Sequence, residues 1–139
     1  MNEDIKRQII IDNYQNPANY QTIKDNTYIS LNSNNESCID NINLFVKLEN
    51  NLIKDIKFNG EACVICISTT SIMTKLLIGK TIKEAKNIIN NYLSMINEQP
   101  YNKDILEDAC IYNSIAKQPS RIKCATITWN SINNLLNNK

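Results

Sequence analysis

The sequence predicts an α+β domain in which a small antiparallel sheet of about three strands is covered by helices. Two segments, 42–48 and 52–58, alternate apolar and polar residues as half-buried strands do. The three residues between them leave room only for a hairpin, so these strands are antiparallel. After residue 60 the apolar residues recur at helical spacing. The 139 residues suit one core, and residues 1–139 are expected to form a single domain.

The chain before the hairpin is expected to open with a short helix over residues 3–14. Its apolar residues fall near helical spacing, acidic residues stand at its start, and Pro17 stops it. Residues 27–31 could add a third strand. The polar stretch 32–36 is expected to form a loop that leads to Cys38.

Three helices are expected after the hairpin. The first spans residues 61–78, carries the small residues 68–71 and is closed by Gly79. The second follows the capping box at 81–84 and keeps one apolar face up to Pro100. Residues 104–112 show a weaker helical pattern. The last helix follows Pro119, with apolar residues at helical spacing at Ala125, Trp129, Ile132 and Leu136.

Composition narrows the classes of function. Fifteen Lys and Arg against 14 Asp and Glu leave a formal charge of +1, which favours neither nucleic acid nor an anionic membrane as a partner. The absence of His excludes Ser-His-Asp and Cys-His catalysis. No apolar run reaches the roughly 20 residues of a membrane span, and residues 1–11 resemble no targeting peptide. A cytoplasmic protein with reduced cysteines is therefore expected.

Four side chains suit a metal site. Cys38 and Asp40 stand two apart in an extended segment, so both can point to one side. Cys63 lies at a strand-to-helix junction, where free backbone N–H groups and the helix dipole favour a thiolate. Cys124 lies at the expected start of the last helix. Three thiols and one carboxylate are a four-coordinate set that zinc prefers, although each cysteine could instead be a small core residue.

Other residues bear on whether these cysteines are metal ligands or core residues. Arg121 and Lys123 precede Cys124 and would favour its anion, or they are simply the solvated first turn of a helix. Cys110 lies in an irregular segment and is expected to be a core residue.

The pair Cys63 and Cys66 has a competing interpretation. A CxxC that opens a helix after a strand is typical of a thioredoxin-like dithiol oxidoreductase. A hairpin precedes it here, where a parallel crossover would be expected, and the usual aromatic and Pro residues between the cysteines are missing. A further alternative is that Cys66 is a spare or fifth thiol near the metal, one helical turn from Cys63.

Four blocks in order resemble the IscU/NifU amino-terminal superfamily. They are Tyr14-Gln15-Asn16-Pro17, Cys38-Ile39-Asp40, Phe58-Asn59-Gly60-Glu61-Ala62-Cys63 and Arg121-Ile122-Lys123-Cys124-Ala125-Thr126 with Trp129. The chain is most similar to the SufU branch, because Lys123 stands where IscU scaffolds carry His and the stretch between Cys63 and Cys124 is long. Ile39 and Ala62 depart from the glycines usual in the family, which would cost on the order of 1 kcal/mol if either needs a positive φ.

The resemblance implies an IscU/SufU-like fold and a zinc ion held by Cys38, Asp40, Cys63 and Cys124. It also implies a zinc-dependent sulfurtransferase that takes persulfide sulfur on Cys38 from a PLP-dependent cysteine desulfurase of the SufS type. The sulfur would pass to downstream iron-sulfur assembly proteins. The alternative is an IscU-like scaffold that assembles an iron-sulfur cluster on the same cysteines.

Overall fold

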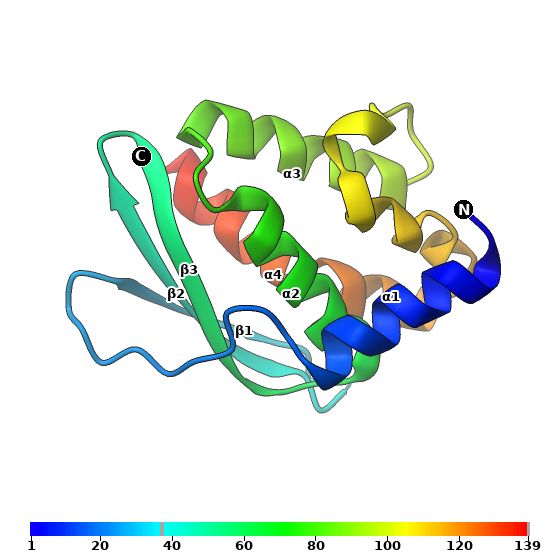
Figure 1. Cartoon of the computed structure of the whole chain (residues 1–139), viewed down its shortest axis with the longest axis horizontal. Coiled ribbons are helices and arrows are strands. Elements are labelled where there is room, and N and C mark those ends of the chain that lie inside the picture. Colours follow the sequence, from blue (N-terminus) through cyan, green and yellow to red (C-terminus); the bar gives the residue numbers. More distant parts are fainter. Residues whose placement is uncertain (37, 139) are drawn as a thin grey trace.

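The structure, a computed structural model, describes residues 1–36 and 38–138 (Figure 1). Its helices are α1 (Glu3–Gln15), α2 (Val64–Leu77), α3 (Ile82–Ile96) and α4 (Pro119–Asn137). Its strands are β1 (Ile29–Asn34), β2 (Asn41–Glu49) and β3 (Leu52–Glu61). Three short 3-10 helices, η1 (Lys103–Ile105), η2 (Glu107–Tyr112) and η3 (Ile115–Lys117), link α3 to α4. None of the described helices combines the length and the apolar character needed to cross a membrane.

The three strands form one antiparallel sheet in the order β1-β2-β3, which confirms the predicted fold class. The hairpin between β2 and β3 turns at Asn50 and Asn51, whose φ angles of 52° and 65° suit asparagine. β1 begins two residues later than predicted because Asp25 closes a turn onto Thr27 and Tyr28. It also continues to Asn34, through residues that the sequence assigned to a loop.

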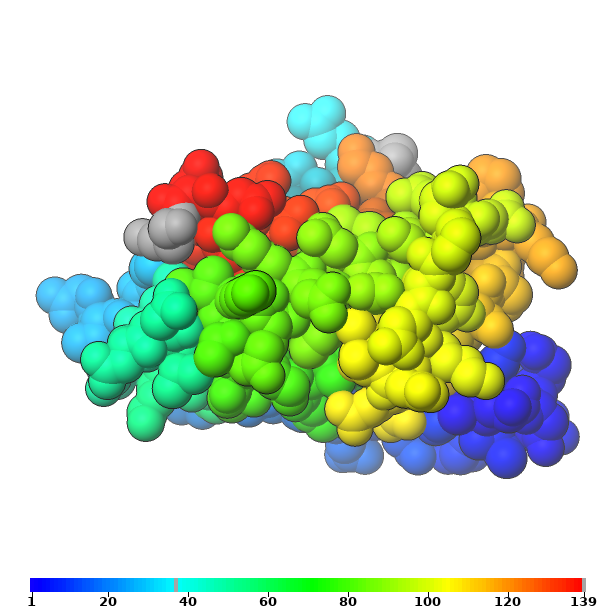
Figure 2. All heavy atoms as spheres, turned by 90° about the horizontal axis from the view of Figure 1, so that it is seen from above, coloured from blue at the N-terminus to red at the C-terminus, as the bar shows by residue number. Residues whose placement is uncertain are grey.

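One face of the sheet packs against α2 and α4 (Figure 1). That face consists of fully buried apolar side chains, namely Ile42, Leu44, Val46, Ile53, Ile56 and Phe58. In Figure 2, α3 and the short helices after it form the outer layer, with α1 at one end. Tyr92 of α3 stacks on Trp129 of α4, with ring centroids 3.8 Å apart and an interplanar angle of 8°. The predicted capping box is present, since Thr81 and Glu84 exchange both hydrogen bonds.

The predicted start of the helix after the hairpin was wrong. β3 runs through Gly60 to Glu61, and α2 begins only at Val64, with Cys63 as its N-cap residue. Gly60 pairs with Ile42 in the ladder and has a φ of +124°, so it continues the strand in a conformation that other residues rarely adopt. Gly79, with a φ of +88°, follows α2 as predicted.

The single helix expected over residues 104–112 is instead split between η1 and η2. Glu107 has a φ of +47°, which interrupts any continuous right-handed helix at this point. The small residues 68–71 of α2 are all buried, and their hydroxyl groups form hydrogen bonds with neighbouring elements. Ser68 shares a hydrogen bond with Tyr112 and Thr70 with Thr128, which ties α2 to η2 and α4.

Candidate metal centre

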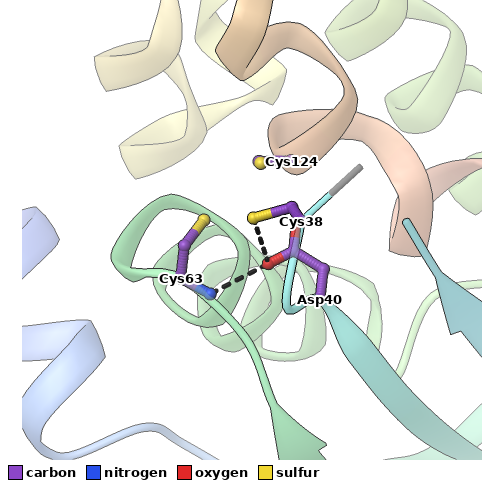
Figure 3. A group of neighbouring side chains, drawn as sticks. All are labelled: Cys38, Asp40, Cys63 and Cys124. Carbon is purple, nitrogen blue, oxygen red and sulfur yellow. Dashed lines mark hydrogen bonds between the residues drawn. The ribbon is translucent and has the colours of Figure 1, made fainter. Parts of the chain in front are cut away.

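The four predicted donors come from three separate parts of the fold and converge at one end of the sheet (Figure 3). Cys38 and Asp40 lie in the connection between β1 and β2, Cys63 caps α2, and Cys124 lies in α4. One donor atom from each lies within 4.8 Å of the other three. The sequence predicts that these four donors lie close together, and the structure places them so.

The β1–β2 connection is closed by backbone hydrogen bonds. The Asn35 N–H donates to the Asp40 carbonyl at 2.9 Å, and the Cys38 N–H donates to the Asn35 carbonyl at 3.0 Å. Strand pairing continues this geometry, because Asn41 pairs with Glu61 two residues before Cys63. The sheet thus fixes the distance between the Cys38 loop and the start of α2.

Asp40 is the best-fixed donor of the group. Its side chain is 2% exposed, and Oδ1 accepts the Cys63 N–H at 2.9 Å and the Cys38 thiol at 3.6 Å (Figure 3). Burial raises the pKa of Asp40, but interactions with the Cys124 thiol and with Cys63 outweigh it and hold the pKa below its usual value. Oδ2 is buried without a hydrogen-bond partner among the described residues. A carboxylate with one buried, unpartnered oxygen, in a group that also contains three thiols, is a donor that a cation would satisfy.

The donor set fits zinc by chemistry and by size. Zinc prefers four ligands drawn from sulfur, nitrogen and carboxylate oxygen. With Zn–S bonds of about 2.3 Å, a tetrahedral site needs its sulfurs roughly 3.8 Å apart. The donors, within 4.8 Å of one another, would close around an ion by a contraction of about 1 Å or less.

The N-terminus of α2 acts on Cys63 in the expected direction, but burial has the larger effect on the pKa of its thiol. Burial raises the pKa of Cys63 and outweighs the N–H groups of Cys66 and Ile65, which lower it. Burial likewise raises the pKa of Cys124, and Asp40 adds to the effect. Both side chains therefore stay protonated thiols unless a cation compensates the charge.

Cys124 lies in the second turn of α4, because this helix begins at Pro119, earlier than its placement at a helix start implied. Its backbone N–H is thus no longer one of the free groups of the N-terminus. Arg121 and Lys123 are both exposed, and neither forms an ion pair with another residue in the described part of the chain. Their predicted influence on an anionic sulfur stays a prediction.

The remaining notable residues lie around this group. Cys66 is fully buried three residues after Cys63, and Cys110 is half-buried in η2 with its thiol 3.2 Å from the Lys103 carbonyl. Ile39 and Ala62 do not have positive φ angles, so replacing the usual glycines costs no backbone strain here.

Sequence reasoning missed two features beside the donors. Asn35 is buried, and its amide lies 3.9 Å from the Cys124 sulfur, as a donor toward it. No sequence pattern marks this asparagine among its polar neighbours. A surface hollow of about 540 Å³ is lined partly by Tyr14, Tyr20 and Ile39, the last of which follows Cys38 in the chain. Tyr14 is 43% exposed.

A helix-backed three-stranded sheet with three thiols and a carboxylate gathered at one end defines a small protein with a candidate metal-thiolate site. More specifically, residues 5–125 match the family model described as the NifU-like N terminal domain, and the chain belongs to this family. The resemblance inferred from the sequence is thereby confirmed.

Named relatives agree with this assignment. The chain is 34% identical over 131 residues to the zinc-dependent sulfurtransferase SufU of Bacillus subtilis, covering 94% of this chain and 88% of that protein. It is 33% identical over 126 residues to the iron-sulfur cluster assembly scaffold protein IscU of Streptococcus pyogenes, covering 89% and 77%. A crystal structure described as a SUF-system scaffold protein from Fervidobacterium islandicum superposes with a TM-score of 0.86 over 94% of this chain and 96% of that chain. At 24% identity, this last likeness shows the fold.

Proposed function

We propose that this chain is a zinc-dependent sulfurtransferase of iron-sulfur cluster assembly that accepts persulfide sulfur from a PLP-dependent cysteine desulfurase of the SufS type. The observation that carries the proposal is the unequal burial of the four donors. Cys38 is exposed, whereas Asp40 and Cys124 are buried and Cys63 is half-buried. Three donors can hold an ion from inside the protein while Cys38 faces a partner. The similarity to SufU and IscU proteins supports the assignment to iron-sulfur cluster assembly.

The site must activate Cys38 without a histidine. A free thiol has a pKa near 8.5 and is mostly protonated at neutral pH, and the chain contains no imidazole base. Zinc, when bound, keeps its sulfur ligands as thiolates and so supplies the anion that a base would otherwise generate. Asp40 orients Cys38 relative to α2, since Oδ1 contacts both the Cys38 thiol and the Cys63 N–H. Arg121 and Lys123 are proposed to favour the released thiolate electrostatically.

The transfer step uses the Cys38 sulfur as nucleophile. The Cys38 thiolate attacks the terminal sulfur of the desulfurase persulfide, and a new S–S bond forms on Cys38. The S–S bond to the desulfurase cysteine breaks, and that cysteine leaves as a thiolate that takes a proton from solvent. One sulfur atom changes carrier and no external oxidant or reductant is needed.

Turnover of a SufS-type desulfurase on cysteine, measured with and without this protein, tests the proposal. The zinc-loaded protein should stimulate turnover, and Cys38→Ala should abolish the stimulation. Cys110→Ser is the matched control, because Cys110 lies outside the donor group and should keep full stimulation. A zinc-loaded wild-type protein that leaves turnover unchanged would overturn the assignment.

An iron-sulfur scaffold is the second candidate, and the 33% identity to an IscU scaffold favours it. The same three thiols and Asp40 could hold a cluster. Purification without oxygen distinguishes the two functions. A colourless protein with one zinc per chain supports transfer, while a brown protein with cluster absorbance supports the scaffold.

The dithiol oxidoreductase is disfavoured by the fold. β2 and β3 before the CxxC are antiparallel, and Cys63 faces the other donors of the group rather than a separate redox site. An oxidoreductase would lose all activity in Cys66→Ser, whereas a sulfurtransferase with this change would still form a persulfide on Cys38.

A further inference from the structure

Sulfur transfer through Cys38 requires that one thiolate leaves the metal while the other sulfur ligands stay. The donor group contains three thiols, Cys38, Cys63 and Cys124, whose sulfurs lie within 4.8 Å of one another (Figure 3). The three thiols are chemically alike, so their surroundings must distinguish the sulfur that leaves from those that stay. Cys124 is only 4% exposed, and a buried anion is stable only where hydrogen-bond donors replace water. A donor beside Cys124 would therefore help to keep this sulfur on the metal.

Asn35 is a donor in this position. It directly follows β1 and is only 3% exposed, although Asn34 and Glu36 on either side of it are exposed. Its side-chain amide donates toward the Cys124 sulfur, with 3.9 Å between nitrogen and sulfur. Hydrogen bonds to sulfur are longer than those to oxygen because the sulfur atom is larger. The contact joins the connection after β1 to α4, across 89 residues of sequence.

The position of Asn35 is fixed by contacts on both sides. Ser33, which is buried in β1, shares a hydrogen bond with Ser131 of α4, so the end of the strand is held on that helix. The Asn35 N–H donates to the Asp40 carbonyl at 2.9 Å, and the Asn35 carbonyl accepts the Cys38 N–H at 3.0 Å. Asn35 therefore contacts three of the four donor residues, two through its backbone and one through its side chain.

The backbone contacts and the side-chain contact of Asn35 have different chemical effects. The backbone bonds shape the loop that carries Cys38 and Asp40, and every residue type except proline can form both of them. The side-chain bond needs the amide N–H. A neutral sulfur accepts hydrogen bonds weakly, whereas an ionised acceptor binds the same donor roughly twice as strongly. The Asn35 amide thus stabilises Cys124 most when Cys124 is a thiolate, which is its form as a metal ligand.

We propose that Asn35 is a positioning residue for sulfur transfer, whose side-chain amide keeps the Cys124 thiolate on the metal while Cys38 leaves to accept sulfur. The inference rests on the proposed function. Asn35 transfers no proton, because an amide donates its hydrogen bond without ionising. Cys38, in contrast, is exposed, so water can solvate its thiolate once it has left the ion. A buried, hydrogen-bonded sulfur and an exposed one give the site a fixed order of ligand loss.

Zinc affinity, measured by competition with a chelator, tests the proposal in Asn35→Leu. Leucine has a similar volume and can form both backbone bonds, but it lacks the amide. Zinc binding should weaken roughly 10-fold, as it does when a hydrogen-bond partner of a metal ligand is removed. Asn34→Leu is the matched control, since Asn34 is exposed and donates to Asn32, and its zinc affinity should equal that of wild type. Asn35→Asp keeps the shape of the side chain but places a carboxylate beside the sulfur, and it should weaken binding at least as much.

Two further backgrounds show through which sulfur Asn35 acts. In Cys38→Ala, which mimics the state after Cys38 has left, Asn35→Leu should still weaken zinc binding roughly 10-fold. In Cys124→Ala the acceptor is missing, so the same change should have no further effect. A spectrum gives a second readout. With Co²⁺ in place of zinc, the thiolate-to-metal charge-transfer band of Asn35→Leu should shift to lower energy, because a thiolate without its hydrogen bond gives up electron density more easily.

The outcomes separate this inference from the function on which it rests. An equal loss of affinity in the Cys124→Ala background, or no loss in the Cys38→Ala background, overturns the role of the Asn35 amide. An unshifted charge-transfer band does the same. A wild-type protein that binds no zinc overturns the metal centre and both proposals. Unchanged desulfurase turnover together with the expected zinc affinities would overturn the proposed function, while the hydrogen bond from Asn35 to Cys124 would stand.

Discussion

Gly60→Ala tests whether the pairing of β2 with β3 sets the geometry of the metal centre. Gly60 has a φ of +124°, and an added Cβ would overlap the backbone carbonyl of Asn41 on the neighbouring strand. The backbone conformation costs on the order of 1–2 kcal/mol for an L residue. Relieving the overlap by moving the strands adds roughly 1–3 kcal/mol. We therefore expect the free energy of unfolding to fall by about 2–5 kcal/mol.

Gly79→Ala is the matched control. Gly79 also has a positive φ, of +88°, but an added Cβ would meet no atom within 4 Å, so only the backbone cost of about 1 kcal/mol applies. Urea denaturation of the metal-free proteins measures both losses. Competition with a chelator should show weaker zinc binding in Gly60→Ala alone, because Asn41 follows Asp40 directly. Equal losses of stability in the two variants, or unchanged zinc affinity in Gly60→Ala, would refute this reasoning.

Three further changes probe the core, the sheet and the metal centre. Thr69→Val should lower the free energy of unfolding by about 1–3 kcal/mol in urea denaturation, because Thr69 accepts the buried indole N–H of Trp129 at 2.9 Å. Thr126→Val should cost less, because among the described residues the Thr126 hydroxyl donates to carbonyls of its own helix alone. The pKa of Asp55 is lowered, since hydrogen bonds from a lysine and a tyrosine outweigh the effect of burial; its ionised form therefore stabilises the fold above the ordinary pKa. Asp55→Asn should lose roughly 1 kcal/mol at pH 7 and converge with wild type as the pH falls through the lowered pKa, and an equal loss at acidic pH would contradict the assignment. Asp40→Asn should weaken zinc binding roughly 10-fold or more in chelator competition. A substitution by Asn outside the metal site is the control and should leave zinc binding unchanged.

The predictions that held rest on local interactions. The hairpin follows from strict alternation and from two asparagines that accept positive φ angles. The helix Ile82–Ile96 follows from a capping box and one apolar face, both of which are properties of neighbouring residues. Such features need no knowledge of distant contacts.

The predictions that failed concern places where distant partners decide the local conformation. A helix was expected from residue 61, but the pairing of Gly60 with Ile42 carries β3 on to Glu61. Asn32 and its polar neighbours were assigned to a loop, although pairing with β2 makes them strand. At Cys63 the backbone N–H groups lower the pKa of the thiol as expected, but burial by other elements raises it by more.

The sequence alone determined which donor atoms the protein owns, that histidine takes no part, and that strands precede the main helices. Only the tertiary structure decided that Cys38, Asp40, Cys63 and Cys124 meet within 4.8 Å, and that Cys38 alone of the four is exposed. Whether the four donors converge, and how deeply each is buried, depends on many contacts between residues far apart in the chain. A pattern of neighbours cannot encode them, because the sheet and the packing of α2 and α4 must exist before the four donors share one place.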